Sequence, residues 1–281
     1  MTNFKTAIPF SIFLLSSTLT SAATFQYAVN LKSGGLLIKE KEILNAGSGS
    51  RFELERWYRS RSLFRGFFGQ GWCSNLDEKI KLIDKGTIEL YTCHSPRPYL
   101  FHLNSKAEVY LSPDKPDESI RPGFGSYTRF FKSEELSQYN FQGELKSLSS
   151  RGTKWKIKRN SKKTMESLIP EKGEPLTLHW HPDLLLIQQI QSADSLYKFK
   201  YDGFLLKSAG SLKYNYNDLD NLTQRFPSSP VFQVKYDNQE DRVLQIESRC
   251  LETYQYHKRH QATIKCPEQN TRMAYLNDEG V

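Results

Sequence analysis

The C-terminal half of the sequence repeats one short pattern about every twenty residues. In each copy, apolar and polar residues alternate, an aromatic residue closes the run, and a turn and a short apolar run follow. The closing aromatics are Trp180, Tyr201, Tyr216, Tyr236 and Tyr256, which are 21, 15, 20 and 20 residues apart. Alternation with a period of two is typical of a β-strand with one buried face. A repeat of this length with a turn inside it predicts one β-hairpin per unit.

The two faces of these hairpins differ in composition. Aromatic residues occupy one face and lysine, asparagine and glutamine the other. Tyr201, Tyr216 and Tyr236 are expected to be largely buried, whereas Lys198, Lys200, Lys213 and Lys235 are expected outside. A single hairpin cannot cover its own aromatic face, so neighbouring hairpins must stack side by side. The sequence therefore predicts an all-β fold of antiparallel β-hairpin repeats that form a curved or spiralling sheet.

The N-terminus is typical of a secretory signal peptide. One positive charge precedes a mostly apolar run at 7–15, and small and polar residues at 16–23 follow. The apolar run is too short to span a membrane. We expect cleavage near Ala23 and a soluble exported protein that is secreted, periplasmic or on the cell surface, without a transmembrane segment.

Four cysteines follow the signal segment: Cys73, Cys93, Cys250 and Cys266. An even number of cysteines in an exported chain indicates two disulfides. Three pairings are open. Cys73–Cys93 and Cys250–Cys266 are favoured because each pair lies within one segment of the chain, and free buried thiols are the alternative. No CxxC motif indicates a zinc site.

The chain has 39 lysines and arginines against 31 acidic residues, a formal net charge of +8. The basic residues are spread along the chain. This balance is compatible with anionic glycan, lipid head groups or nucleic acid as partners. Of these, a glycan or an anionic envelope surface is expected and nucleic acid is not. A basic face that is simply solvated is the alternative.

A long ordered motif precedes the repeats. After "NLKSGGLLIKEKEIL" the chain reads "FELERWYRSRSLFRGFFGQGWCSNLDEKIKL". The residues that carry the motif are Arg56, Trp57, Tyr58, Ser60, Gly69, Gly71, Trp72 and Leu76. Together with the repeat copies "YDGFLLKSAG", "YNDLDNLTQ" and "YDNQEDRVLQI", it resembles the Rhs and teneurin families of YD-repeat proteins. The resemblance covers roughly residues 30–81 and 153–265, and residues 87–149 match less clearly.

The resemblance implies a spiralling β-sheet shell, which in longer relatives encloses a C-terminal toxin or extends from the cell surface. We find no aspartyl self-cleavage motif and no toxin domain after the repeats, so the chain is expected to be a short or truncated member of the family. A second repeat-bearing chain or a toxin or effector is its expected partner. The expected domains are the signal peptide at 1–23, an Rhs N-terminal-like β region at 24–149 and a degenerate YD-repeat region at 150–281.

The residues of this motif are also typical of a structural element within a β-sheet. Trp57 and Trp72 are expected to plug a β-layer, and Gly66, Gly69 and Gly71 to allow tight turns. Four arginines, Arg56, Arg59, Arg61 and Arg65, are expected to contact carbonyls or acids. An anion-binding patch with interleaved aromatics, as in single-stranded nucleic acid binders, is the alternative.

No enzyme motif emerges from the sequence. "AGSGS" at 46–50 is not a nucleophile elbow, and HExxH and phosphate-loop motifs are absent. His179 and His181 lie on one strand face and, with His257 and His260, would suit a metal. A polar outer face is the favoured explanation, because Leu176, Leu178 and Trp180 occupy the inner face. We therefore assign no catalytic, cofactor or metal residue. The expected function is an exported non-enzymatic scaffold or interaction module of Rhs/YD-repeat type. A carbohydrate-binding cell-surface protein and an enzyme of unknown chemistry are the alternatives.

Overall fold

The computed structural model describes residues 24–275 except 31–32, 94, 193, 228–231, 238, 249, 257–260 and 267–268. For the last strands, from residue 261 on, it describes the backbone and, at Thr263, the side chain. The predicted signal peptide at 1–23 lies outside the described residues and stays a prediction. Within the described part, no helix is long and apolar enough to cross a membrane.

A small antiparallel sheet begins the fold. Its order is β1 (Thr24–Val29), β2 (Leu36–Asn45), β3 (Arg51–Arg59) and β6 (Trp72–Ser74). A two-stranded ribbon, β4 (Arg65–Gly66) and β5 (Gly69–Gln70), lies between β3 and β6 in the chain. The β5 turn depends on Gly69, which has a φ of +104° and packs where an added Cβ would lie 2.3 Å from the carbonyl oxygen of Phe204.

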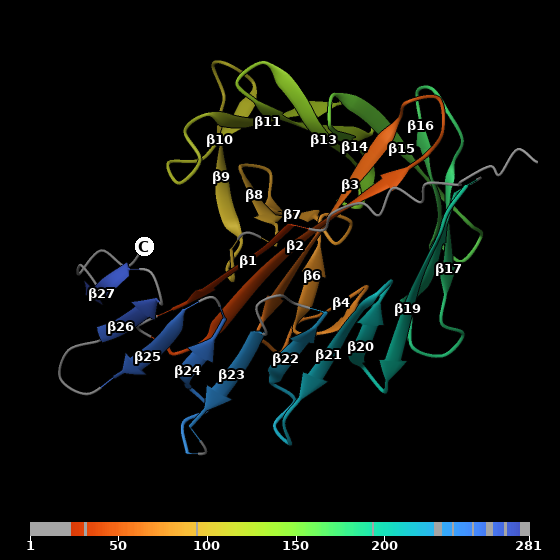
Figure 1. Cartoon of the computed structure of the whole chain (residues 1–281). Helices are drawn as coiled ribbons and strands as arrows, with labels where there is room; N and C mark the ends of the chain where they lie inside the picture. Colours follow the sequence, from red (N-terminus) through yellow and green to blue (C-terminus); the bar gives the residue numbers. More distant parts are fainter. Residues whose placement is uncertain are drawn as a thin grey trace, which may run out of the picture.

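A long sheet follows, in which each strand from β7 to β27 pairs antiparallel with the next. Its first strands are β7 (Lys79–Asp84), β8 (Thr87–Tyr91), β9 (Tyr99–Asn104), β10 (Val109–Leu111), β11 (Glu118–Gly123), β12 (Ser126–Phe131), β13 (Glu134–Asn140), β14 (Leu145–Ser150), β15 (Thr153–Arg159) and β16 (Met165–Pro170). The remaining strands are β17 (Leu176–Trp180), β18 (Ile187–Gln191), β19 (Leu196–Asp202), β20 (Leu205–Ala209), β21 (Leu212–Tyr216), β22 (Leu222–Phe226), β23 (Phe232–Tyr236), β24 (Val243–Glu247), β25 (Leu251–Gln255), β26 (Gln261–Cys266) and β27 (Gln269–Tyr275). Figure 1 shows this sheet curving around β1, β2 and β3.

The predicted fold class is confirmed. The chain is all-β in its described part, and the predicted units form the hairpins β17–β18, β19–β20, β21–β22, β23–β24 and β25–β26. The domain boundary expected at 149/150 falls at the end of β14, and the sheet continues through it into β15. The division into domains stays a prediction.

A β-bulge accompanies the closing aromatic in four consecutive units. The register shifts between His179 and Trp180, Lys200 and Tyr201, Asn215 and Tyr216, and Lys235 and Tyr236. A bulge bends its strand locally and changes where a side chain is aimed. Each closing side chain reaches the hairpin that precedes its own.

These closing side chains form a series of equivalent hydrogen bonds. The donor and acceptor pairs are Trp180 Nε1 to Met165 O (2.6 Å), Tyr201 to Ile187 O (2.6 Å), Tyr216 to Leu206 O (2.9 Å), Tyr236 to Leu222 O (3.0 Å) and Tyr256 to Val243 O (2.6 Å). Every acceptor lies at or near the start of the second strand of a hairpin. The closing position therefore needs a ring that carries a donor, which tyrosine and tryptophan have and phenylalanine lacks.

The predicted faces are largely confirmed. Lys198, Lys200, Lys213 and Lys235 are exposed. Tyr201, Tyr216 and Tyr236 are mostly buried, as predicted, although less completely than the residues of the core. Their rings pack against the edge of the core at the hairpin ends. The fully buried positions lie two residues earlier, as at Phe199 and Tyr214.

One hydrophobic core joins the small sheet to the inner face of the long sheet. Ring centroids lie 4.9 Å apart for Phe68 and Phe199 and 5.3 Å apart for Trp72 and Tyr214. Trp72 is fully buried, as expected of a plug. The same prediction for Trp57 is wrong. Strand alternation turns Trp57 to the opposite face of β3, where it is half-buried under the ammonium of Lys39, 4.4 Å from the ring centroid.

Candidate functional site

Two glutamates lie inside the core. The inward face of β2 consists of Leu36, Ile38, Glu40, Glu42 and Leu44, all of which are buried. Period-two alternation places the carboxylates on the same face as the aliphatic side chains. Buried charges are costly unless they are paired, so partners must come from neighbouring strands.

Arg56 of β3 is the first partner. Its Nη2 lies 2.9 Å from Glu40 Oε2 and 2.7 Å from Glu42 Oε1, and its side chain is fully buried. The guanidinium also lies 5.4 Å from the ring centroid of Trp72, within range of a cation–π contact. Arg56 therefore contacts acids, as the sequence predicts. The alternative of an anion-binding patch at this arginine is wrong, because solvent does not reach it.

The long sheet supplies the remaining partners. Arg225 Nε of β22 lies 2.7 Å from Glu40 Oε1, and the Tyr214 hydroxyl of β21 donates to Glu40 Oε2 at 2.6 Å. Two arginines thus balance two glutamates in the contact between the sheets. Desolvation raises the pKa of Glu42 to about 7, although Arg56 beside it opposes the shift. These carboxylates are enclosed and paired, so the cluster fastens the two sheets together.

A second buried ion cluster lies in the first part of the long sheet. Arg129 of β12 donates from Nη1 to Glu78 (2.7 Å) and from Nε to Glu118 (2.8 Å). Glu78 also accepts the hydroxyls of Ser137 (2.7 Å) and Tyr139. Burial of Arg129 opposes its charge, but the two carboxylates beside it hold its pKa well above the usual value.

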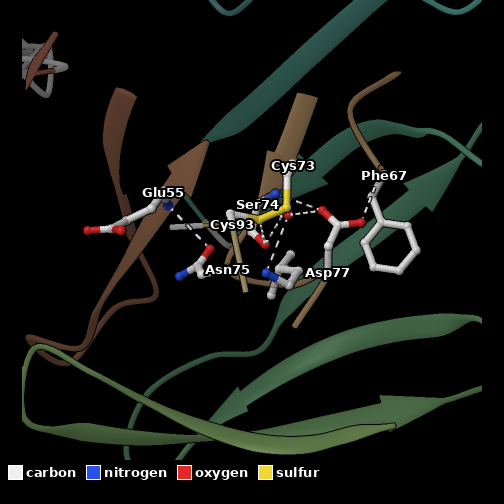
Figure 2. Close-up of a disulfide and its surroundings, with 8 residues drawn as sticks. Glu55, Phe67, Cys73, Ser74, Asn75, Asp77 and Cys93 are labelled. Carbon is white, nitrogen blue, oxygen red and sulfur yellow. Dashed lines mark hydrogen bonds between the residues drawn. A yellow bond between two sulfur atoms is a disulfide. The ribbon is translucent and has the colours of Figure 1, made fainter. Parts of the chain in front are cut away.

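A disulfide joins the two sheets at another point, as Figure 2 shows. Cys73 lies in β6 of the small sheet and Cys93 follows β8 of the long sheet, with their Cα atoms 5.6 Å apart. The predicted Cys73–Cys93 pair is confirmed. A disulfide of this kind indicates a non-cytoplasmic, oxidising compartment.

Asp77 holds the chain beside this disulfide (Figure 2). Its carboxylate accepts from the Phe67 amide (2.9 Å), the Ser74 amide (2.8 Å) and the Ser74 hydroxyl (2.6 Å). Burial raises the pKa of Asp77 to about 6, and these hydrogen bonds oppose the shift. Cys73, Asp77 and Cys93 are the one trio of close potential metal ligands in the described part. The disulfide uses both sulfurs, so the trio offers no thiolate.

The structure describes only some of the remaining cysteines and histidines singled out in the sequence. The register that pairs Leu251 with Lys265 continues to bring positions 250 and 266 opposite each other. The Cys266 side chain lies outside the described residues, so the Cys250–Cys266 disulfide stays a prediction. His179 is exposed on the outer face beside Gln191 (3.3 Å), whereas His257 and His260 lie outside the described residues.

The outer face of the repeats carries a groove of about 470 Å³. It crosses four strands, from β20 to β23. Its lining residues are Lys207, Asn215, Tyr216, Thr223, Gln224, Gln233, Val234 and Lys235. Two lysines and three amides thus line the groove, and none of its lining residues is acidic.

Register and bulges build this groove. Asn215, Gln224 and Gln233 lie opposite one another across β21, β22 and β23, and Asn215 Nδ2 donates to Gln224 Oε1 at 2.9 Å. Lys207 and Thr223 are the extra residues of the bulges in β20 and β22. The short side chain of Thr223 leaves space between its longer neighbours. Sequence reasoning placed Lys235 outside but missed the groove, because the groove depends on the register of four strands.

The N-terminal part of the chain has a recognisable family match. Residues 26–98 match the model of a domain of unknown function, DUF6531, which is associated with Rhs and YD-repeat proteins in general. The match covers the small sheet and the first strands of the long sheet. No curated protein matches the chain.

Proposed function

We propose that this chain is an exported, non-enzymatic β-sheet protein of Rhs/YD-repeat type that acts as a scaffold or interaction module. The observation that carries the proposal is the arrangement of the two sheets. Hairpin repeats, each bonded to the preceding one through its closing aromatic, curve around a small sheet that carries the DUF6531 match. Such a sheet presents a long, regular outer surface, which suits contact with a partner.

The chemistry of the acidic residues supports a role without catalysis. Glu40 and Glu42, two buried carboxylates in the contact between the sheets, are bound by Arg56 and Arg225 and shielded from solvent. The groove on the outer face has no carboxylate in its lining. A glycosidase, by contrast, needs two carboxylates that flank its substrate.

A carbohydrate-binding protein of the cell surface is the second candidate. The groove that Lys207, Gln224, Gln233 and Lys235 line is the observation that favours it. Amides and ammonium groups donate to hydroxyl and carboxylate oxygens, which sugars offer in number.

The proposal is tested by following export and mass. The full chain with a C-terminal epitope is expressed in a bacterium that has a periplasm, the cells are fractionated, and the purified protein is analysed by mass spectrometry. We expect a mature N-terminus near Thr24, an intact Cys73–Cys93 disulfide, and no carboxylate-dependent hydrolysis of a panel of glycan and peptide substrates. A chain that stays in the cytoplasm with Met1 attached and Cys73 reduced would contradict the export. Hydrolysis of any of these substrates that co-purifies with the folded protein and is absent from a mock purification would contradict the absence of catalysis.

A further inference from the structure

We propose that the outer groove between β20 and β23 binds an extended acidic polysaccharide, with Lys207 and Lys235 as the contacts for its carboxylates and the row of Asn215, Gln224 and Gln233 as the contacts for its hydroxyls. This inference rests on the proposed role as an exported interaction module and names the partner class of that surface.

The charges of the groove favour an anion. Lys235 is exposed on β23 and has no ion-pair partner among the described residues. Lys207 on β20 lies 3.8 Å from Asp202, whose side chain is 76% exposed, so this contact is weak and open to exchange. On the other side, the exposed Glu247 of β24 lies opposite Gln233. The groove is therefore a cationic strip bounded by single acids.

The spacing of the lysines favours a ligand longer than one sugar. Three strand spacings separate β20 from β23, and adjacent strands lie about 4.8 Å apart, so the two lysines are anchored at least about 14 Å from each other. The groove between them runs across the strands. An extended chain with regularly placed carboxylates can reach both ammonium groups.

The amide side chains on the floor of the groove favour a ligand that is rich in hydroxyl groups. An amide side chain offers both a donor and an acceptor, as a hydroxyl does. The Asn215–Gln224 hydrogen bond fixes one end of the row at 2.9 Å, whereas the Gln233 side chain has no partner in the described part. Such a row of amides can exchange hydrogen bonds with successive hydroxyls of a sugar chain.

The same floor argues against single-stranded nucleic acid. Proteins that bind it without sequence preference stack bases on aromatic rings. The one aromatic residue in the lining is Tyr216, which is half-buried, and its hydroxyl is bound to the Leu206 carbonyl. The Lys207 ammonium already lies over that ring at 5.5 Å.

The test uses the mature, oxidised protein and polygalacturonate oligomers as the probe, with titration calorimetry at low and high salt. Lys207→Gln/Lys235→Gln removes the two charges, and Thr223→Tyr fills the middle of the groove. Lys146→Gln/Lys156→Gln is the matched control, because both residues are exposed on the long sheet outside the groove and the change in net charge is the same. Thermal unfolding verifies that each variant is folded.

We expect binding of the probe that weakens with salt, about tenfold weaker binding in the groove double variant, and less than a twofold change in the control. Thr223→Tyr should weaken binding by a similar factor, and uncharged dextran should bind far more weakly than the acidic probe. Absence of binding, an equal loss in the control variant, or equal binding of a single-stranded oligonucleotide would overturn the proposal. Each of these results would leave export and the fold of the shell untouched, so the groove can fail without the proposed function failing.

Discussion

The strands from β17 to β25 and those from β7 to β14 belong to one sheet, yet different contacts hold them. In the repeat part, a ring with a donor closes each hairpin onto the preceding one, as Tyr201 and Tyr236 do. In the first part, Arg129 bridges Glu78 and Glu118 inside the sheet, and the disulfide at Cys93 adds a covalent tie. The aromatic contacts recur in every hairpin, so they produce a repeat that is visible in the sequence. The ion cluster occurs once, so the sequence of the first part shows no corresponding pattern.

The largest expected effect on stability comes from Arg129, whose ion cluster holds the first part of the long sheet. Arg129→Met should lower the free energy of unfolding by about 3–5 kcal/mol, because Glu78 would stay buried without a cation and Glu118 would keep only Lys115, 3.2 Å away. Urea unfolding measures the loss. Lys158→Ala is the control, since its ion pair with Glu166 is exposed and should contribute less than about 1 kcal/mol. Equal losses at Arg129 and Lys158 would show that charge does not hold the first part together.

Removal of the disulfide tests how much this covalent bond contributes to the stability of the first part. Cys73→Ser/Cys93→Ser should lower the free energy of unfolding by about 3 kcal/mol, as expected for a crosslink between positions 20 residues apart. Comparison of urea unfolding for the double variant and the oxidised wild type measures the loss. If reduction of the wild-type protein costs nothing while Arg129→Met remains costly, the ion cluster alone accounts for the stability of this part.

The contact between the small sheet and the repeats should depend on pH. The folded-state pKa of Glu42 is raised to about 7 from its ordinary value of 4.5, so the native state binds a proton more tightly than the unfolded chain. Stability should therefore fall, on the order of 1–3 kcal/mol, as pH rises from about 4.5 to 7, and stay level above that. Asp77, with a pKa of about 6, contributes with the same sign. Glu118, whose pKa is lowered, acts below this window.

Glu42→Gln separates these contributions. The groups that face Glu42 are Arg56, Glu40 and Arg225, and all of them stay in the variant. The fall in stability between pH 4.5 and 7 should become smaller, leaving the part due to Asp77. An unchanged profile in Glu42→Gln would show that this carboxylate does not titrate in the contact between the sheets.

The smallest effects test the repeat part. Tyr236→Phe keeps the ring and removes the donor to the Leu222 carbonyl, which should cost about 1 kcal/mol. The same change at Tyr201 should cost a similar amount, because it makes the equivalent bond. Tyr216→Phe should cost more, because the Tyr216 hydroxyl also accepts from Trp72 Nε1 at 3.1 Å. Lys200→Ala, next to Tyr201 but exposed, should cost less than about 0.5 kcal/mol. A cost at Lys200 that matches the cost at Tyr201 would mean that the register is wrong.

The sequence predicts much of the repeat part and little of the site. Alternation and turns predict the hairpins, the exposed lysines and the closing aromatics, because these are local properties of each unit. The cysteine spacing favours the Cys73–Cys93 pair. The alternation of β2 also carries a signal that our interpretation missed, since Glu40 and Glu42 share a face with Leu36 and Leu44. Their partner Arg225 lies 185 residues from Glu40 in the chain, and no local pattern identifies such a partner.

The groove was unpredictable for a related reason. Lys207 and Lys235 belong to different hairpins, and their common position depends on bulges in β20 and β22 as well as on the pairing of β22 with β23. Bulges displace residues by one position without changing the composition of a strand. Only the assembled sheet shows which polar residues lie side by side.

Native-state hydrogen exchange tests most directly whether the repeats and the small sheet form one folded unit. Amides of β2 and β3, in residues 36–59, and of the repeats, in residues 197–247, should exchange through the same cooperative opening, with the same dependence on urea, because they share one core and the Glu40–Arg225 contact. Glu42→Gln or Arg129→Met should then shift both sets together. Exchange of residues 36–59 at lower urea, while residues 197–247 remain protected, would contradict the account.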